Sequence, residues 1–380
     1  MFPTLLRTFK CLALPVFLLF LSGCAPQIFT DPLPPGVTVR SFGPSAPGSP
    51  LAWDPSGQRL ALASGGLGVR DLQGGDTPLS SGRPRALTWS PSGDKLAAGF
   101  DAPGGRSLLR VYAMAGGIVG ETSLEGRVGG LHWSPDGTVV AACQATTPFS
   151  FGTGLKVILY LWDGAGAPKG RTLRESVVRP ATLSRSGEKG LPDLHLRLSP
   201  WGDEILYTRL YDPPNLQASL QLVLARLNSP EERILAQVAT SSGGGLFSRD
   251  GESVLYGDGV ASTLLHNPWE GGELVLFDRP GRRLALSPSQ RYALVDGTLY
   301  RDGTEIAALA EGVQGFFAPS GERLLLRRNG RLFLAEGLEG AGDAGSFRPA
   351  ESLRTLRDWR SRGLISHEEY LERKERMQTP

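Results

Sequence analysis

The chain has few of the residues that most often carry catalysis or bind metals. Its 380 residues include 3 Cys, 4 His and 3 Met. The spacings His-x-x-x-His, Cys-x-x-Cys and Gly-x-Ser-x-Gly are absent, as are the P-loop and EF-hand patterns. We therefore expect a protein that is not an enzyme, with no catalytic residues, no metal ligands and no cofactor.

An excess of charge of one sign is also absent. The 40 Lys and Arg nearly balance the 38 Asp and Glu, which leaves a formal net charge of +2. A balance of this kind creates no broad field to attract a polyanion. We expect no nucleic-acid partner.

The sequence has no apolar run long enough to span a membrane, and the most apolar segment, near the N-terminus, is short. Arg7 and Lys10 precede the apolar segment from Cys11 to Leu21, which is too short for an ordinary transmembrane helix. The segment ends in Leu-Ser-Gly-Cys24, which resembles the lipobox of bacterial lipoproteins. The resemblance implies that residues 1–23 are a signal peptide. A plain secretory signal with an incidental Cys is the alternative.

The lipobox resemblance also implies that Cys24 carries fatty acyl chains such as palmitate and becomes the first mature residue. Two acyl chains provide stable membrane anchoring, so we expect an extracytoplasmic protein of the cell envelope. The next residue, Ala25, leaves the choice of inner or outer membrane open. Cys143 would be the one remaining cysteine, which we expect to be a buried apolar side chain without a disulfide.

Glycine and proline are abundant, with 50 and 29 copies, and they recur in a repeated motif. The repeats are Trp53-Asp-Pro-Ser-Gly57, Trp89-Ser-Pro-Ser-Gly93, Trp133-Ser-Pro-Asp-Gly137, Leu198-Ser-Pro-Trp-Gly202, Phe247-Ser-Arg-Asp-Gly251, Leu286-Ser-Pro-Ser-Gln290 and Phe317-Ala-Pro-Ser-Gly321. Apolar stretches flank each copy, which indicates a turn between two strands. The copies begin about 31 to 65 residues apart, which brackets the spacing of four-stranded propeller blades.

Each residue of the motif suits a turn. Ser accepts backbone hydrogen bonds, Pro sets φ near −65°, and Gly takes a left-handed conformation. We expect the aromatic residue to pack between adjacent sheets. We assign structural turn roles to Trp53, Pro55, Gly57, Trp89, Pro91, Gly93, Trp133, Pro135 and Gly137.

The repeats resemble the PD40 or TolB-like family of WD40-like repeats, whose core is an aromatic residue followed by Ser-Pro-Asp-Gly. The resemblance covers residues 43–337 and implies an all-β fold, a β-propeller of about seven blades. Two copies depart from the pattern, since Arg249 replaces the Pro and Gln290 replaces the Gly. TolB also has an additional domain before its propeller, so the resemblance carries over the fold and not the role of TolB.

Residues 24–42 read as a lipid-anchored tether with a possible closing strand. The segment from Val37 to Phe42 alternates like a strand, and the seventh blade shows three strands of its own. Pairing of this segment with that blade would close the ring and remove two exposed edges.

The C-terminus predicts two short helices. Residues 338–350 form a flexible linker, and residues 351–378 resemble the SHOCT family of helical hairpins. The apolar residues of the pattern are Leu353, Leu356, Trp359, Tyr370 and Leu371. Two short helices cannot bury a core unaided, so the hairpin is expected to bind a protein partner or a second copy. Docking on its own propeller, or contact of its arginines with anionic lipid, are the alternatives.

Two insertions, Gln144–Gly154 and Asp163–Asp193, are interpreted as long loops that could contact a partner. The segment Glu273–Phe277 is interpreted as the third strand of its blade.

Two functions remain open. The first is a non-catalytic binding or scaffold platform for envelope proteins or glycans. The second is a degenerate propeller enzyme, a hydrolase or dehydrogenase, with a metal or cofactor in the central channel. Convergent Asp, Glu and His in that channel would favour the enzyme.

Overall fold

The computed structural model divides the chain into two compact units, residues 1–30 and residues 31–380. It describes Phe29 and residues 31–134, 137–149, 152–178, 195–211, 219–227, 229–238, 244–269, 274–321 and 323–338. Cys24, Pro135 and the five apolar residues of the predicted hairpin lie outside the described residues. Among the described residues, no helix is long and apolar enough to span a membrane.

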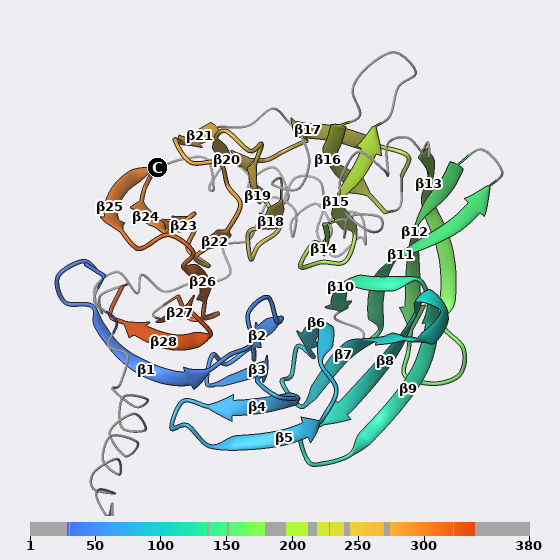
Figure 1. The fold of residues 1–380 in the computed structure, drawn as a ribbon, viewed down its shortest axis with the longest axis horizontal. Helices are drawn as coiled ribbons and strands as arrows, with labels where there is room; N and C mark the ends of the chain where they lie inside the picture. The colour runs from blue at the N-terminus through green and yellow to red at the C-terminus, as the bar shows by residue number, and fades with distance from the viewer. Residues whose placement is uncertain are drawn as a thin grey trace, which may run out of the picture. The chain divides into compact units, whose positions relative to one another are not determined.

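The described strands of the second unit form seven antiparallel sheets of four strands each, arranged in a ring (Figure 1). Blade one consists of β2 (Leu51–Trp53), β3 (Arg59–Ala63), β4 (Leu67–Asp71) and β5 (Asp76–Ser80). Blade two consists of β6 (Pro84–Trp89), β7 (Lys95–Ala102), β8 (Arg106–Ala113) and β9 (Ile118–Glu125). Blade three consists of β10 (Arg127–Trp133), β11 (Val139–Phe149), β12 (Gly152–Trp162) and β13 (Lys169–Val178). A short 3-10 turn, η1 (Pro103–Gly105), connects β7 and β8.

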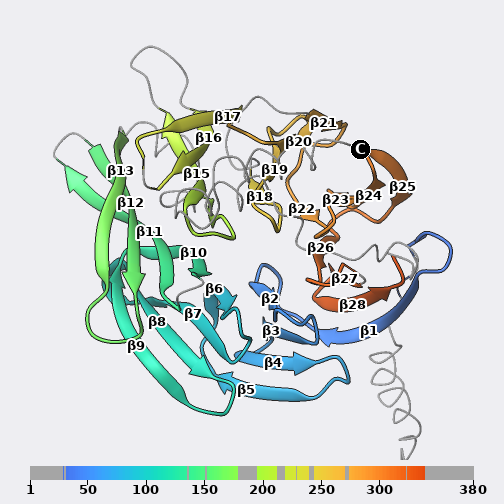
Figure 2. The same cartoon turned by 180° about the vertical axis from the view of Figure 1, so that it is seen from behind.

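Blades four to seven continue the ring (Figure 2). Blade four consists of β14 (Leu196–Leu198), β15 (Glu204–Tyr211), β16 (Ser219–Arg226) and β17 (Glu232–Val238), and blade five of β18 (Gly245–Phe247), β19 (Ser253–Gly257), β20 (Ser262–His266) and β21 (Leu274–Phe277). Blade six consists of β22 (Leu284–Leu286), β23 (Tyr292–Val295), β24 (Thr298–Arg301) and β25 (Thr304–Ala308). Blade seven consists of β26 (Gln314–Phe317), β27 (Arg323–Arg328), β28 (Arg331–Glu336) and β1 (Thr38–Pro44). The fold is a seven-bladed β-propeller, as the repeat predicts.

The seventh blade combines the two ends of the ring. Strand β1 pairs antiparallel with β28, from Thr38 opposite Glu336 to Pro44 opposite Arg331, with an irregularity between Ser41 and Gly43. Strand β1 therefore contains most of the predicted closing strand, Val37–Phe42, and it continues to Pro44. Because β1 covers the free edge of β28, blade seven has the same number of strands as the others.

The repeated motif forms the turn between the first and second strand of every blade. In all seven copies the backbone N–H of the last residue donates to the carbonyl of the residue after the aromatic or leucine, at 2.9–3.0 Å. The last residue has φ between +62° and +86°, a region in which glycine carries no steric cost. Gln290 adopts this conformation as well, with φ +62°.

The hydrophobic core lies between neighbouring blades, where the sheets pack face to face. The cluster between blades two and three contains Leu109, Val111, Trp133, Cys143 and Trp162, all of which are buried. Similar clusters lie between blades one and two, three and four, four and five, and five and six, and between blades seven and one, where Phe42 packs with Leu60 and Leu334. The expectation that Cys143 is a buried apolar residue agrees with its complete burial.

Three expectations from the sequence are wrong. The described part of Glu273–Phe277, Leu274–Phe277, forms the fourth strand of blade five, β21, because the short segment Ser262–His266 forms the third. Gln144–Gly154 does not form a loop along its length. Its described residues extend β11 and β12, which pair as far as Phe149 opposite Gly152. Residues 169–178 of the second expected loop form β13, which pairs with β12.

Candidate functional site

A cavity of about 610 Å³ lies at the centre of the ring. All seven innermost strands contribute lining residues, through Leu51, Leu87, Leu131, Leu198, Leu246, Leu284 and Phe316. The lining residues belong to the beginnings of these strands and to the segments that precede them. The cavity therefore opens on the side of the ring opposite to the seven motif turns, and it belongs to the propeller as a whole.

Five arginines line the cavity, and its described lining residues include no Asp or Glu. They are Arg85 on β6, Arg197 on β14, Arg282 and Arg283 directly before β22, and Arg327 on β27. The chain as a whole is nearly neutral, so this gathering of one sign of charge is local. A concave surface lined by like charges concentrates its potential and attracts ions of the opposite sign.

Arg327 is the arginine that the structure holds most firmly. Its side chain is 7% exposed, its Nε donates to Gln314 Oε1 at 2.9 Å, and its Nη1 donates to the carbonyl of Ser49 at 2.6 Å. The guanidinium stacks on the Phe316 ring, 5.2 Å from its centroid. Burial and the nearby charge of Arg283 lower the pKa of Arg327.

His195 and Arg197 stand side by side at the beginning of blade four. His195 lies directly before β14, and its Nε2 is 2.6 Å from the carbonyl of Gly245 on blade five. Burial and the charge of Arg197 lower the pKa of His195 to about 3, so its imidazole is neutral at physiological pH. Arg197 is exposed to the cavity and hydrogen-bonds backbone carbonyls, including that of Leu196 at 3.2 Å.

The remaining arginines lie on the rim. Arg282 and Arg283 are exposed, and their backbone N–H groups donate to the carboxylate of Asp296, at 3.2 Å and 2.8 Å. Arg85 forms an ion pair with Asp101 at 3.4 Å. The rim therefore combines one arginine that has an acidic partner with others whose side chains face solvent.

Glycines let the innermost strands approach one another around the cavity. A Cβ added at Gly245 would lie 2.5 Å from Leu206 Cδ2, and one added at Gly315 would lie 2.5 Å from Leu294 Cδ2. Both contacts are with the blade that precedes the glycine. A larger residue at either position would push two blades apart, so these glycines set the width of the ring at the cavity.

The motif turns lie at the other end of the inner strands. Trp53, Trp89 and Trp133 each donate their indole N–H to a backbone carbonyl of the preceding blade, at 3.0, 2.9 and 3.2 Å. Arg249, which replaces the motif proline, donates to the carbonyl of Pro319 in the turn of blade seven. The structure places Pro55, Gly57, Pro91, Gly93 and Gly137 in the same turns, away from the cavity lining.

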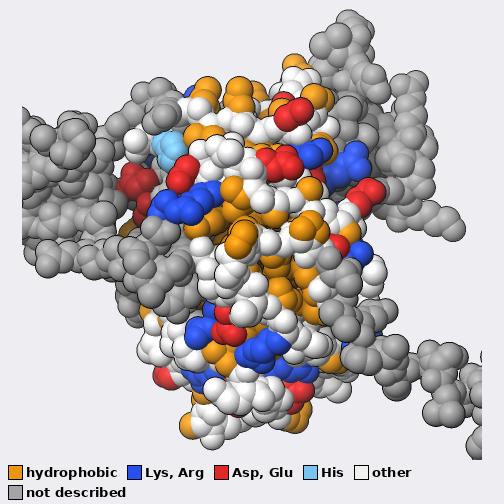
Figure 3. Space-filling view, turned by 90° about the vertical axis from the view of Figure 1, so that its left-hand side faces the viewer, with side chains coloured by type: hydrophobic (Ala, Val, Ile, Leu, Met, Phe, Trp, Pro, Cys, Tyr) orange, Lys and Arg blue, Asp and Glu red, His pale blue; other side chains and the backbone are white. Residues whose placement is uncertain are grey.

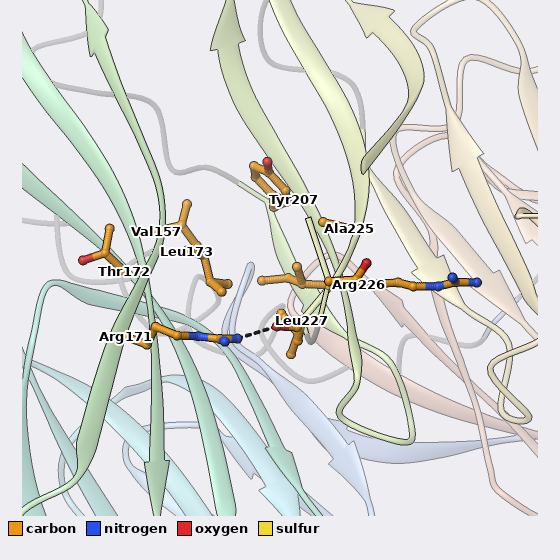
Figure 4. Close-up of a pocket in the computed structure, with 10 residues that line it drawn as sticks. Val157, Arg171, Thr172, Leu173, Tyr207, Ala225, Arg226 and Leu227 are labelled. Atoms are coloured by element: carbon orange, nitrogen blue, oxygen red, sulfur yellow. Dashed lines mark hydrogen bonds between the residues drawn. The ribbon is translucent and has the colours of Figure 1, made fainter. Parts of the chain in front are cut away.

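A second, smaller cavity of about 180 Å³ lies between blades three and four. Figure 4 shows Arg171 on β13 reaching across to the carbonyl of Leu227, to which it donates a hydrogen bond, while Arg226 points the other way. Arg226 stacks on the Trp269 ring at 4.5 Å. Arg171 therefore bridges this cavity from blade three to blade four, whereas Arg226 connects blade four to blade five.

The outer side of the ring has mixed charge. On the side that carries β24, β25 and β1, Lys, Arg, Asp and Glu side chains are interspersed with hydrophobic ones (Figure 3). Ion pairs there include Arg291 with Asp302 at 3.3 Å and Arg323 with Glu336 at 3.0 Å. The single-sign lining of the central cavity therefore differs from the described outer surface.

No group of three or more His, Cys, Asp or Glu among the described residues is placed to hold a metal ion. Sequence reasoning did not identify the arginines of the cavity. The available signal was basic residues shortly before the motif, such as Arg85 before Trp89, Arg197 before Leu198 and Arg283 before Leu286. Their convergence depends on the closure of the ring, which single-strand patterns do not show.

Comparison with solved structures supports the fold. The chain is similar to one in the crystal structure of the mitotic checkpoint complex, with 14% identity, coverage of 88% of this chain and 99% of that one, and a TM-score of 0.52. It is also similar to a chain of Kuenenia stuttgartiensis hydrazine synthase (15% identity, 81% and 95% coverage, TM-score 0.48) and to the Dos1 propeller (11%, 79% and 94%, 0.48). At these identities the similarity concerns the fold alone. No family model and no curated protein matches the chain.

Proposed function

We propose that this chain is an extracytoplasmic lipoprotein, anchored through Cys24, whose propeller is a non-catalytic binding or scaffold platform for proteins or glycans of the cell envelope. The observation that carries the proposal is the central cavity of about 610 Å³, to which every blade contributes. A rigid ring that presents a concave, charged site is suited to binding. The lipobox resemblance around Cys24 supports a location of the platform at a membrane.

The contacts of Asp31 fit an anchored ring. Its Oδ1 lies 2.9 Å from Arg328 Nη1, and its Oδ2 accepts the backbone N–H of Ala310 at 3.0 Å. Ala310 precedes β26 and Arg328 ends β27, so Asp31 is held on the side where the cavity opens. The fixed point follows Cys24 by 7 residues, a span of at most about 25 Å. An acylated Cys24 would therefore keep the ring close to the bilayer.

The alternative function, a propeller enzyme with a metal or cofactor in its channel, requires convergent carboxylates and histidines. In the described lining of the cavity, the charged side chains that accompany His195 are arginines, and no Asp or Glu is among them. Arginine is always protonated in proteins and neither ligates metals nor acts as a general base. The chemistry of the cavity therefore supports binding over catalysis.

Metabolic labelling with palmitate tests the anchoring. The wild-type chain and a Cys11→Ser control should both incorporate label and partition with membranes, because Cys11 is removed with the signal peptide. Cys24→Ala should lose the label and appear in the soluble fraction. Label that persists in Cys24→Ala would show that the lipobox is not used and would remove the anchor from the proposal.

A further inference from the structure

We propose that the central cavity is a binding site for a small, multiply charged oxyanion, a compound that carries two or more phosphate or carboxylate groups. The proposal rests on the function proposed above, because it names the ligand class of the platform's central site. The ligand would sit among Arg197, Arg282, Arg283 and Arg327, at the beginnings of the innermost strands.

The first argument is that the side chains of these arginines have no ion-pair partner among the described residues. Among the described residues, no carboxylate forms an ion pair with the side chains of these four arginines. Arg85 adds a fifth guanidinium to the lining, and its carboxylate partner Asp101 is mostly exposed to solvent. Like charges gathered in one cavity repel one another, and the repulsion is strongest where protein has displaced water. A bound polyanion would offset this repulsion, because each arginine would then lie beside an opposite charge.

The second argument is preorganisation at Arg327. Of the five N–H groups of a guanidinium, three donate to Gln314 and Ser49, which leaves two for a ligand. The stack on Phe316 fixes the plane of the group. A buried arginine held in this way loses little conformational entropy when a ligand binds, and its planar fork matches the oxygens of a phosphate or carboxylate.

The third argument is size. A cavity of about 610 Å³ lies within the range of small-molecule sites and is too small for a folded domain to enter. His195 is neutral because its pKa is lowered to about 3, and its Nε2 is engaged with Gly245. The charge that attracts the ligand is therefore that of arginine, so any pH dependence of binding between about pH 6 and 8 should come from ionisation of the ligand and not of the lining.

Isothermal titration calorimetry on the full chain in neutral detergent tests the proposal, with tripolyphosphate and citrate as probes. Arg282→Gln and Arg197→Gln should each weaken binding of the preferred probe by about tenfold or more, since each removes a charge-assisted contact. Arg331→Gln is the matched control, because Arg331 is exposed on β28 and does not line the cavity. It should bind like the wild type.

The two probes distinguish phosphate from carboxylate as the recognised group. Higher salt should weaken binding to the wild type, as it does for any site that relies on exposed charges. Absence of binding for both probes, or an equal loss in Arg331→Gln, would overturn the proposal. That failure would leave palmitate labelling of Cys24 untouched, so it is distinguishable from failure of the anchored platform.

Discussion

Individual side chains join the blades at the motif turns. Trp89 donates its indole N–H to Ala52, and its ring lies 4.9 Å beneath the guanidinium of Arg59. Arg59 in turn bonds Asp54 at 3.0 Å and the carbonyl of Gly93 at 2.7 Å. In this first blade the Asp54 carboxylate takes the place of the motif serine, accepting the backbone N–H of Arg59. One indole and one arginine therefore connect two blades.

Replacement of Trp89 by Phe should lower the free energy of unfolding by about 1–3 kcal/mol, because the half-buried carbonyl of Ala52 loses its donor. Trp201→Phe is the matched control. Its indole N–H also donates to a backbone carbonyl, that of Asp250, but Trp201 is 42% exposed and water can replace the donor. Chemical denaturation of both variants measures the difference, and equal losses would show that the hydrogen bond of Trp89 contributes no more to stability than the exposed bond of Trp201.

Gln290 explains how one repeat tolerates a missing glycine. Its left-handed backbone is accompanied by two side-chain hydrogen bonds to blade five, from Nε2 to Asp250 at 2.7 Å and from Ser253 Oγ to Oε1 at 2.7 Å. These contacts offset the strain that a side chain brings to this conformation. The departure from the motif thus adds a link between two turns.

His132 makes stability depend on pH. Burial lowers its pKa to about 4, against the opposing charge of Asp203, and its buried Nε2 has no hydrogen-bond partner among the described residues. Unfolding returns the pKa to about 6.5, so the unfolded chain binds more protons between these values. Stability should therefore be complete above about pH 6.5 and fall as the pH approaches 4.

His132→Gln should reduce the slope of unfolding free energy against pH in this interval, as measured by denaturation at pH 7, 6 and 5. The decline should not vanish, because His195 has a lowered pKa as well. A variant whose slope equals that of the wild type would show that the pKa of His132 does not differ between the folded and the unfolded chain.

At the scale of the element, β1 is the strand on which ring closure depends. Phe42 is its buried side chain, 6% exposed and packed with Leu60 and Leu334, whereas Ser41 beside it is exposed. Arg70 donates to the carbonyl of Phe42 at 2.8 Å, which ties the strand to blade one. The strand therefore contacts blade one as well as blade seven.

Phe42→Ala should cost about 3–5 kcal/mol of unfolding free energy, because it leaves a cavity at the junction of the two ends of the ring. Ser41→Ala should stay within about 0.5 kcal/mol of the wild type, since an exposed side chain loses little. Thermal unfolding of both proteins checks the pair. A Phe42→Ala protein that melts with the wild type would mean that the strand is dispensable.

Elements differed in how well their sequences predicted them. The aromatic-Ser-Pro-x-Gly turns predicted seven blades because each residue has a local reason for its position. Short third and fourth strands were harder. Ser262–His266 carries only two adjacent leucines, and Lys169–Val178, the outermost strand of its blade, is mostly polar. Patterns of alternation are weak in such strands.

At the scale of the whole molecule, we propose that the predicted C-terminal hairpin would mediate association. It lies outside the described residues. Leu353, Leu356, Trp359, Tyr370 and Leu371 offer more apolar surface than two short helices can bury, at roughly 25 cal/mol per Å². Removal of all residues after Gly345 should leave the melting temperature nearly unchanged and shift sedimenting mass from oligomer to monomer.

Trp359→Glu should have the same effect as the truncation, because association would desolvate a carboxylate. Analytical ultracentrifugation at tens of micromolar compares the three proteins. A wild-type chain that is monomeric at this concentration would exclude self-association and leave a different partner, or docking on the propeller, as the role of the hairpin.

Cross-linking in intact cells tests whether the anchored propeller is a binding platform. Tagged wild type and Cys24→Ala chains would be captured from cross-linked cell envelopes under denaturing conditions and their adducts compared. We expect discrete protein or glycan adducts on the wild type that are lost from Cys24→Ala, because that variant would lack its membrane anchor. A wild type that carries no adduct, or the same adducts on both chains, would show that the propeller is not an anchored binding platform.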